Sequence, residues 1–331
     1  MSIRDERYML GTDLCVWGIP LTNQDTASLA ILLELSGRTS YPFCKLEAID
    51  CRMDAWSVER LGKAIRLSQL TSICLDYNDL KDRGIQGLVQ GLQGNKRLTC
   101  LSLCYCNLGP DSGGLLGKVL EGTAVSELYL DGNDLQCSGA VDLITAIAEH
   151  AQSLSSEEAN VMGTKLAHQI LEADQSVGIY TVVSGQQANT EDPENTTKKI
   201  TTKKKPKRKG SKKKRTSVPE PGPWVSKLHL ADNGIDSRGT EGEIGVLEFV
   251  QLLGCLIRYS KQLSELNLDD NCLGELPASD LLEALTERNK GKLPRLKIKI
   301  TTQLPSATFK AILKQSGKLK VSKKKRKKKK H

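Results

Sequence analysis

Aromatic residues are scarce in this 331-residue chain, at 4% of its length. Binding sites built on rows of stacking aromatic side chains are therefore disfavoured. Long apolar runs are also absent, since the most apolar stretch, residues 246–257, contains Glu248 and Gln251. A membrane-spanning helix needs about 18–20 apolar residues. We therefore expect a buried helix at 246–257 and no transmembrane segment.

The first 30 residues have no basic stretch followed by an apolar one, so a secretory signal is not expected. The chain has 10 Cys residues. Without a secretory signal, this number predicts free thiols in a reducing, intracellular compartment.

Acidic residues are missing from two lysine-rich runs. Residues 198–215 contain 12 Lys and Arg, and residues 318–331 contain 10. Removing these 22 charges from the net charge of +9 leaves −13 for the rest of the chain. The sequence therefore predicts an acidic body that carries two basic segments.

An eleven-residue pattern, L-x-x-L-x-L-x-x-N-x-L, recurs along the acidic body. Strong copies occupy residues 70–80, 98–108, 125–135, 225–235 and 263–273. Weaker copies are assigned to 46–56, which places Cys51 at position 6, and to 293–298, and a degenerate copy to 11–21. A period of this length is typical of a repeat architecture.

Each copy has the alternation of a short strand whose positions 4 and 6 are buried. The polar residue at position 9 is expected to satisfy backbone groups where the strand turns. These structural residues are Asn78, Cys106, Asn133, Asn233 and Asn271. Apolar residues at helical spacing follow in 84–92, 113–120 and 139–148. One repeat is therefore a strand followed by a helix.

These residues resemble the leucine-rich repeats of the ribonuclease-inhibitor type, over about residues 10–150 and 224–316. The resemblance implies a curved horseshoe with parallel strands inside and helices outside. The lysine-rich insertion within the repeats is also similar to leucine-rich repeat proteins associated with ciliated cells. That likeness implies an axonemal assembly, so the expected location is the cytoplasm or the cilium, with the nucleus as the alternative.

The predicted fold class is α/β, a leucine-rich-repeat solenoid interrupted by an insertion. N-terminal repeats occupy 1–152, and an insertion occupies 153–223, with a helix at 155–173 that begins at Ser155 and Ser156 and a disordered, lysine-rich remainder. C-terminal repeats of the same solenoid follow at 224–317, with a closing helix at 306–316, and a basic tail occupies 318–331. The two halves are expected to stack as one unit, because the small number of repeats in each half would bury little apolar surface by itself.

Catalytic signatures are missing from the sequence. None of the four His residues stands in a ligand pair at helical spacing, and no P-loop, GxSxG or dinucleotide motif occurs. Cys100, Cys104 and Cys106 have no second cysteine pair, which a zinc site normally requires. We expect no enzyme activity, no cofactor and no metal.

The exposed strand face, made of positions 3, 5, 7 and 8, is the first candidate binding surface. The sequence places tyrosines and carboxylates there, and this combination favours a basic protein partner. The candidate partner-binding residues are Tyr77, Tyr105, Tyr129, Asp76, Glu127, Asp131, Glu265 and Asp269. The alternative is that these are ordinary polar residues of a solvated strand.

The lysine-rich runs are the second candidate, for contact with a polyanion. The residues concerned are Lys203, Lys204, Lys205, Lys207, Arg208, Lys209, Lys212, Lys213, Lys214, Arg215, Lys323, Lys324, Lys325 and Arg326. Charge alone does not choose among nucleic acid, an anionic membrane surface, acidic protein tails such as those of tubulin, and the protein's own acidic face.

The function expected from the sequence is a non-enzymatic scaffold, a monomeric subunit of a larger assembly. It binds a protein partner through the strand face and attaches to a polyanion through its lysines. The alternative is a nuclear protein that binds nucleic acid nonspecifically through the lysine runs. A ribonuclease inhibitor proper is disfavoured, because the repeats are few and interrupted.

Overall fold

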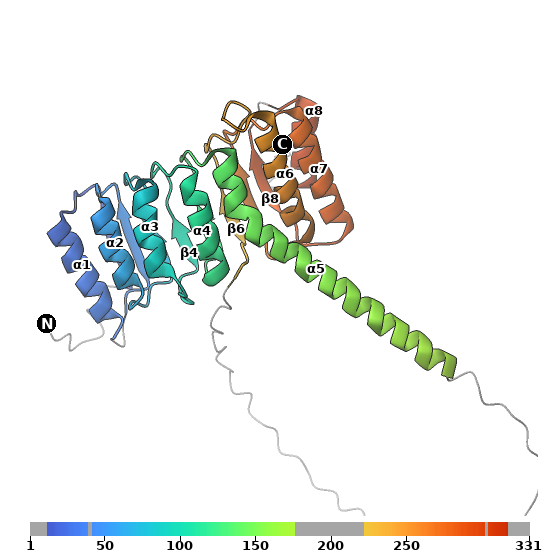
Figure 1. Ribbon diagram of the computed structural model, residues 1–331, viewed down its shortest axis with the longest axis horizontal. Coiled ribbons are helices and arrows are strands. Elements are labelled where there is room, and N and C mark those ends of the chain that lie inside the picture. The colour runs from blue at the N-terminus through green and yellow to red at the C-terminus, as the bar shows by residue number, and fades with distance from the viewer. Residues whose placement is uncertain (1–11, 39–41, 176–221, 302–303, 317–331) are drawn as a thin grey trace, which may run out of the picture. The chain divides into compact units, whose positions relative to one another are not determined.

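The computed structural model describes residues 12–38, 42–175, 222–301 and 304–316, with the side chains of 159–175 left out. Strands and helices alternate along these residues (Figure 1). The predicted α/β class with repeated strand–helix units is confirmed. The repeats form one compact unit, and α5 from Glu157 onward belongs to a second unit. No helix among the described residues is long and apolar enough to span a membrane.

The described strands form a single parallel sheet in chain order. They are β1 (Asp13–Trp17), β2 (Lys45–Ile49), β3 (Ser72–Cys74), β4 (Cys100–Ser102), β5 (Glu127–Tyr129), β6 (Lys227–His229), β7 (Glu265–Leu268) and β8 (Lys297–Ile300). The strands are short because only three to five residues of each repeat, starting at position 3, are extended before the chain turns.

The helices connect consecutive strands and lie together on one face of the sheet (Figure 1). They are α1 (Asn23–Ser36), α2 (Ala55–Ile65), α3 (Lys81–Leu92), α4 (Asp111–Gly122), α5 (Gln136–Gln175), α6 (Gly242–Tyr259), α7 (Glu275–Lys290) and α8 (Ser306–Gln315). The helices expected at 246–257 and 306–316 are present as α6 and α8. Neighbouring helices approach closely, and a Cβ atom at Gly91 of α3 would overlap the backbone of Gly62 in α2.

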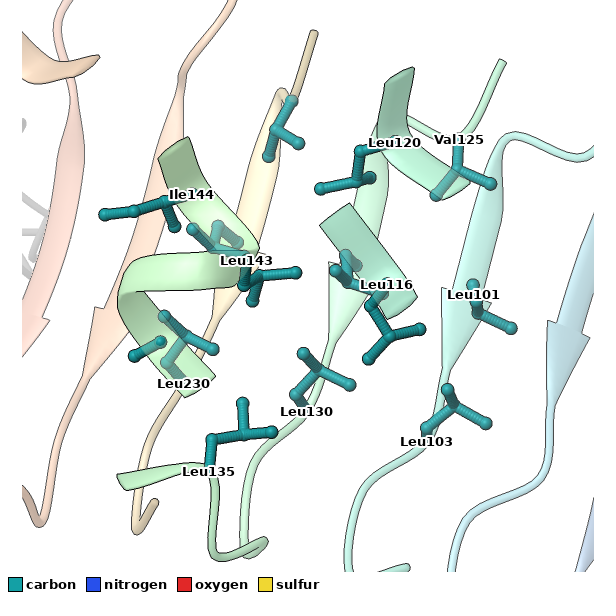
Figure 2. Packing of buried hydrophobic residues seen from close by; sticks show 14 of the residues in the cluster. Leu101, Leu103, Leu116, Leu120, Val125, Leu130, Leu135, Leu143, Ile144 and Leu230 are labelled. Carbon is teal, nitrogen blue, oxygen red and sulfur yellow. The ribbon is translucent and has the colours of Figure 1, made fainter. Parts of the chain in front are cut away.

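The core lies between the sheet and the helices. Positions 4 and 6 of each strand point into it, as Leu101 and Leu103 of the fourth repeat do (Figure 2). Leu116 of α4 and Leu143 of α5 pack into the same cluster (Figure 2). Burial of these side chains is the main stabilising contribution, because each repeat covers the apolar face of its neighbour.

The sheet continues without a break across the insertion. Strand β5 pairs with β6 in regular register, with Glu127 opposite Lys227 and Tyr129 opposite His229. The backbone N–H of Leu130 donates to the carbonyl of His229 at 2.9 Å. About one hundred residues of chain therefore separate two strands that pair as ordinary neighbours.

Position 9 closes each turn with side-chain hydrogen bonds to two repeats. Asn133 accepts the N–H groups of Cys106 and Leu108 at 2.9 and 3.1 Å. Its amide nitrogen donates to the carbonyls of Leu103 and Leu130 at 2.9 and 2.8 Å. One side chain therefore satisfies four buried backbone groups.

The other position-9 residues repeat this arrangement with variations. Asn78 and Asn271 bond both their own and the preceding repeat. Asn233 donates to the carbonyls of Leu130 and Ala231, but its buried Oδ1 has no partner. Cys106, whose thiol is the substitute expected from the sequence, donates to the carbonyl of Leu75 at 3.3 Å.

Two weak repeats are in a different register from the one predicted. Strand pairing aligns Leu46 with Ile73, so this copy begins at Phe43, and Cys51 occupies position 9 instead of position 6. The thiol of Cys51 donates to the carbonyl of Val16 at 3.4 Å, as position 9 requires. The prediction failed because position 6 holds the small Ala48 instead of the leucine that the pattern expects.

The last repeat is also shifted. Leu266 pairs with Ile298, so this copy begins at Arg295 and the predicted copy at 293–298 was two residues early. A charged residue at position 1 hid the true start. The predicted helix at 155–173 is present, but its predicted start at Ser155 and Ser156 is wrong, because these residues lie inside α5, which begins at Gln136.

Residues 176–221, which hold most of the segment predicted to be disordered, and the whole predicted basic tail at 318–331 lie outside the described residues. All the candidate polyanion-binding residues fall within these segments, so their assignment stays a prediction.

We expect Asn133→Ala to lower the free energy of unfolding by about 3–5 kcal/mol. The substitution leaves four buried backbone groups without partners, and each unsatisfied group costs ~1–3 kcal/mol. Relaxation of the surrounding structure recovers part of this cost. Cys106→Ala removes weaker thiol hydrogen bonds and is expected to cost about 1–2 kcal/mol. Urea denaturation followed by circular dichroism measures both. Equal losses in the two variants would contradict the role given to the asparagine.

Candidate functional site

The carboxyl ends of the strands carry a row of residues that share position 8 of the repeat. In each of these repeats the position-8 residue has a positive φ angle, between 50° and 73°. We call this the turn row, and its members are Gly18, Asp50, Tyr77, Tyr105, Gly132, Asp232 and Asp270. Neighbouring members are held by continued backbone pairing, as in the bond from the Tyr77 N–H to the Cys104 carbonyl at 2.9 Å.

Tyr77 and Tyr105 stack on each other in the middle of the turn row. Their ring centroids lie 4.8 Å apart and their planes differ by 7°. This distance follows from the repeat, because adjacent strands are about 4.7–4.9 Å apart and the tyrosines occupy equivalent positions. The side chains nevertheless stay accessible, with 54% of Tyr77 and 45% of Tyr105 exposed.

Gly132 provides the space that the Tyr105 ring occupies. A Cβ atom at position 132 would overlap that ring, and the backbone of Gly132 has φ +73°. The two tyrosines and the glycine therefore form a continuous stack over three neighbouring repeats. Burial, together with Tyr77 and the carboxylate of Asp232, raises the pKa of the Tyr105 hydroxyl, so this hydroxyl stays neutral and can donate.

Acidic residues flank the aromatic stack on both sides. Asp50 precedes Tyr77 in the turn row, and Asp232 and Asp270 follow Gly132, all three with exposed side chains. Sequence reasoning did not include Asp50 among the candidates, because the shifted register of its repeat hid its place at position 8. The site is an aromatic platform between carboxylates.

The third predicted tyrosine, Tyr129, is not part of this platform. It lies at position 5, half-buried, with its ring edge against His229 at a centroid distance of 4.7 Å. Its hydroxyl lies 3.1 Å from Glu127, and Lys227 donates to it at 3.5 Å. Burial, followed by the charge of Glu127, raises the pKa of Tyr129.

The predicted aspartates Asp76 and Asp131 brace neighbouring repeats. Asp76 accepts the hydroxyl of Ser102 at 2.7 Å and the N–H of Cys104 at 2.9 Å. Asp131 accepts the N–H of Ala231 at 2.8 Å, across the insertion. Because their oxygens already bond the next repeat, these carboxylates act mainly as structural links.

The predicted glutamates Glu127 and Glu265 form ion pairs along the strand face. Glu127 pairs with Lys227 at 3.0 Å, and Glu265 pairs with Lys297 at 2.6 Å. Burial alone would raise the pKa of Glu265, but Lys297 outweighs it and the pKa is lowered. Both carboxylates are therefore paired with lysines of the neighbouring strand.

His229 and Asp269 complete the C-terminal part of the face. His229 lies between the carboxylates of Asp131 and Glu265, at 3.4 and 3.5 Å. Asp269 is half-buried beside the exposed Asp270. Of the eight predicted partner-binding residues, the structure brings only Tyr77 and Tyr105 together as an accessible aromatic surface.

Cys74, Cys100 and Cys104 on the strand face are half-buried thiols. Burial is the main cause that raises the pKa of Cys74 and of Cys104 to about 12, and both remain protonated at neutral pH. A protonated thiol is a poor nucleophile and metal ligand. Among the described residues no group of three or more His, Cys, Asp or Glu side chains is arranged to hold a metal ion.

Comparison with known proteins gives no relative. No protein-family model matches the chain, and no curated protein matches it. Function is therefore inferred from the geometry of the chain itself.

Gly132→Ala should displace the Tyr105 ring, because the new methyl group and the ring cannot occupy the same space. Gly18→Ala is the matched control, since Gly18 has φ +65°, occupies the same repeat position and has nothing within 4 Å of an added Cβ. Both variants are expected to lose about 1–2 kcal/mol of stability from backbone strain. Only Gly132→Ala should alter the tyrosine near-ultraviolet circular dichroism, and identical spectra would contradict the stack.

Proposed function

We propose that this protein is a non-catalytic recognition module, built from leucine-rich repeats of the ribonuclease-inhibitor type, that binds a protein partner through the platform of Tyr77 and Tyr105. The observation that carries the proposal is that two stacked aromatic rings remain about half exposed on the strand face. Tyrosine is enriched among the residues that dominate binding energies at protein interfaces.

The backbone at the platform supports a functional reading of these residues. Tyr77 and Tyr105 have φ angles of 60° and 54°, which a bulky residue rarely adopts. Other repeats place glycine or aspartate at the same position, so the turn itself does not require an aromatic side chain. Such a conformation costs about 1–3 kcal/mol, and residues held in it cluster at functional sites.

The surrounding charges favour a basic partner. Asp50 and Asp232 lie beside the platform in the turn row. Neither belongs to the glutamate–lysine ion pairs that link the strands further along the sheet. An arginine side chain fits this chemistry, because its guanidinium stacks on a tyrosine face and pairs with a carboxylate. We propose an arginine-containing segment of a protein as the ligand.

The setting of this activity is also a proposal. The interrupted repeat array and its lysine-rich insertion are similar to leucine-rich repeat proteins of ciliated cells, which makes the axoneme the location to test first. The second candidate, polyanion attachment, is favoured by the 22 Lys and Arg residues concentrated in two acid-free segments. The two functions are compatible, because they use different parts of the chain.

Tyr77→Ala and Tyr105→Ala are each expected to weaken partner binding roughly 30-fold, the equivalent of about 2 kcal/mol for an interface hot spot. The measurement is quantitative mass spectrometry of proteins captured by the full chain from ciliated-cell lysate. Trp56→Ala removes a similarly exposed aromatic residue from α2 and is the control. Retention of the same proteins by all variants would contradict the proposal.

The lysine runs are tested separately by salt. Phosphate-led binding of a DNA duplex should fall by a factor of at least ~1,000 between ~50 and ~200 mM salt if six or more phosphates are contacted. Replacing the lysines and arginines of 203–215 and 323–330 by glutamine should abolish it while leaving capture through the tyrosines intact. Salt-insensitive duplex binding would contradict a polyanion role for these segments.

A further inference from the structure

A groove opens on the helix side of the protein, between the amino-terminal ends of α6 and α7. It has a volume of about 170 Å³. Pockets that bind drug-sized ligands typically measure about 300–1,000 Å³, so this groove has room for a side chain rather than a whole ligand. Its walls are mainly apolar, with Val246 and Leu247 from α6 and Leu273, Leu276 and Pro277 from the β7–α7 segment.

The groove exists because the repeat that contains β6 and α6 is unusually long. Residues 236–241 add a turn before α6 begins, and Ser237 of this turn lines one end of the groove. The following repeat enters α7 directly after Gly274, whose φ is +80°. The two helices therefore start at different distances from their strands.

Two exposed apolar side chains border the groove. Leu276 is 74% exposed and lines it, while Ile244 is 78% exposed and lies one helical turn before Leu247. These are higher exposures than those of Tyr77 and Tyr105 on the strand face. Side chains of this kind next to an apolar groove are typical of a surface that a partner covers.

The charged side chains that line the groove are acidic, and Arg238 in the preceding turn is paired with Asp236. Glu243 and Glu275 line it, and Glu248 and Asp280 are exposed one turn further along the two helices. The first three turns of α6 and of α7 contain no lysine or arginine. An occupant must therefore combine an apolar side chain with flanking positive charge.

Two stretches beyond the described residues combine an apolar side chain with flanking lysines. Ile200 follows Lys198 and Lys199, whereas Leu319 stands between Lys318 and Lys320 and is followed by a second apolar residue, Val321, and by Lys323. We propose that the groove binds the latter stretch, residues 318–323, from a second copy of the protein. Leu319 enters the apolar groove, and the lysines pair with the surrounding carboxylates.

By helix dimensions, Leu319 of the same copy falls short of its own groove. Only four residues separate Leu319 from the end of α8 at Gln315, which allows a span of at most about 14 Å. Helix α8 is about 15 Å long and α7 adds a width of about 10 Å, so the groove lies about 18 Å away at the opposite end of the helices. A contact between different patches on two copies extends into chains or closes into rings.

Peptide binding to the full chain tests the chemistry of the groove. A fluorescein-labelled peptide of residues 317–326, GKLKVSKKKR, is titrated with the protein at ~150 mM salt, and its anisotropy is followed. The Ile244→Ser and Leu276→Ser double variant should bind at least tenfold more weakly. The Ile31→Ser and Leu32→Ser double variant, with two exposed aliphatic residues on α1, should bind unchanged.

A second peptide separates apolar contact from charge. Replacing Leu319 and Val321 by serine keeps every positive charge and should weaken binding at least tenfold. Equal binding of both peptides would overturn the proposal, because the contact would then be electrostatic only. The Tyr77→Ala and Tyr105→Ala variants should bind the peptide normally, so failure here leaves the strand-face function untouched.

Sedimentation velocity of the full chain tests the second copy as the occupant. The average mass should rise with protein concentration, and the Leu319→Ser variant should remain monomeric. A monomeric wild-type chain whose groove still binds the peptide would overturn the assignment to a second copy and point to a lysine-flanked segment of another protein.

Discussion

Each repeat must turn its chain away from a short strand while the backbone groups at the turn remain buried. The side chain at position 9 meets this requirement by bonding carbonyls of its own and the preceding repeat. Asn78, Asn133 and Asn271 also accept backbone N–H groups of the preceding repeat. Asn133 does so for four groups at once. Because these bonds connect neighbouring repeats, they also fix the strands in register. Every equivalent position then falls into a straight row across the sheet.

The accessible surface follows from this register. Residues at the strand ends with left-handed backbone conformation form a row, in which Tyr77 and Tyr105 are one strand spacing apart. This spacing is also a favourable distance for stacking aromatic rings. The next row position is Gly132, where a side chain would prevent the stack. Elsewhere on the same face, Asp76, Glu127 and Asp131 are engaged with neighbouring repeats. The exposed Tyr77 and Tyr105 therefore differ in accessibility from the engaged acidic residues, although the sequence places all of them on the same face.

The sequence predicted the repeated strand–helix units because leucine spacing and polar position-9 residues report directly on local structure. It misplaced two repeats, at Phe43 and Arg295, where small or charged residues replaced the expected leucines. The site was less predictable. Tyr77 and Tyr105 were named, but their stacking, the space provided by Gly132 and the separate engagement of Tyr129 depend on contacts across repeats. The groove between α6 and α7 arises from unequal loop lengths. The 38 residues between the copies that start at 225 and 263 indicate the longer loop, but not the groove that it opens.

The pairing of β5 with β6 has a consequence for how this chain could be divided. The two strands hold the array together through ordinary ladder bonds and the brace from Asp131 to Ala231, none of which uses residues 157–217. Covalent continuity at this junction is therefore dispensable for the contacts that join the two halves. The protein has the design of a two-piece molecule, in which a polypeptide ending near Ser156 of α5 and another starting near Trp224 retain the strand pairing and the α5 contacts that join them.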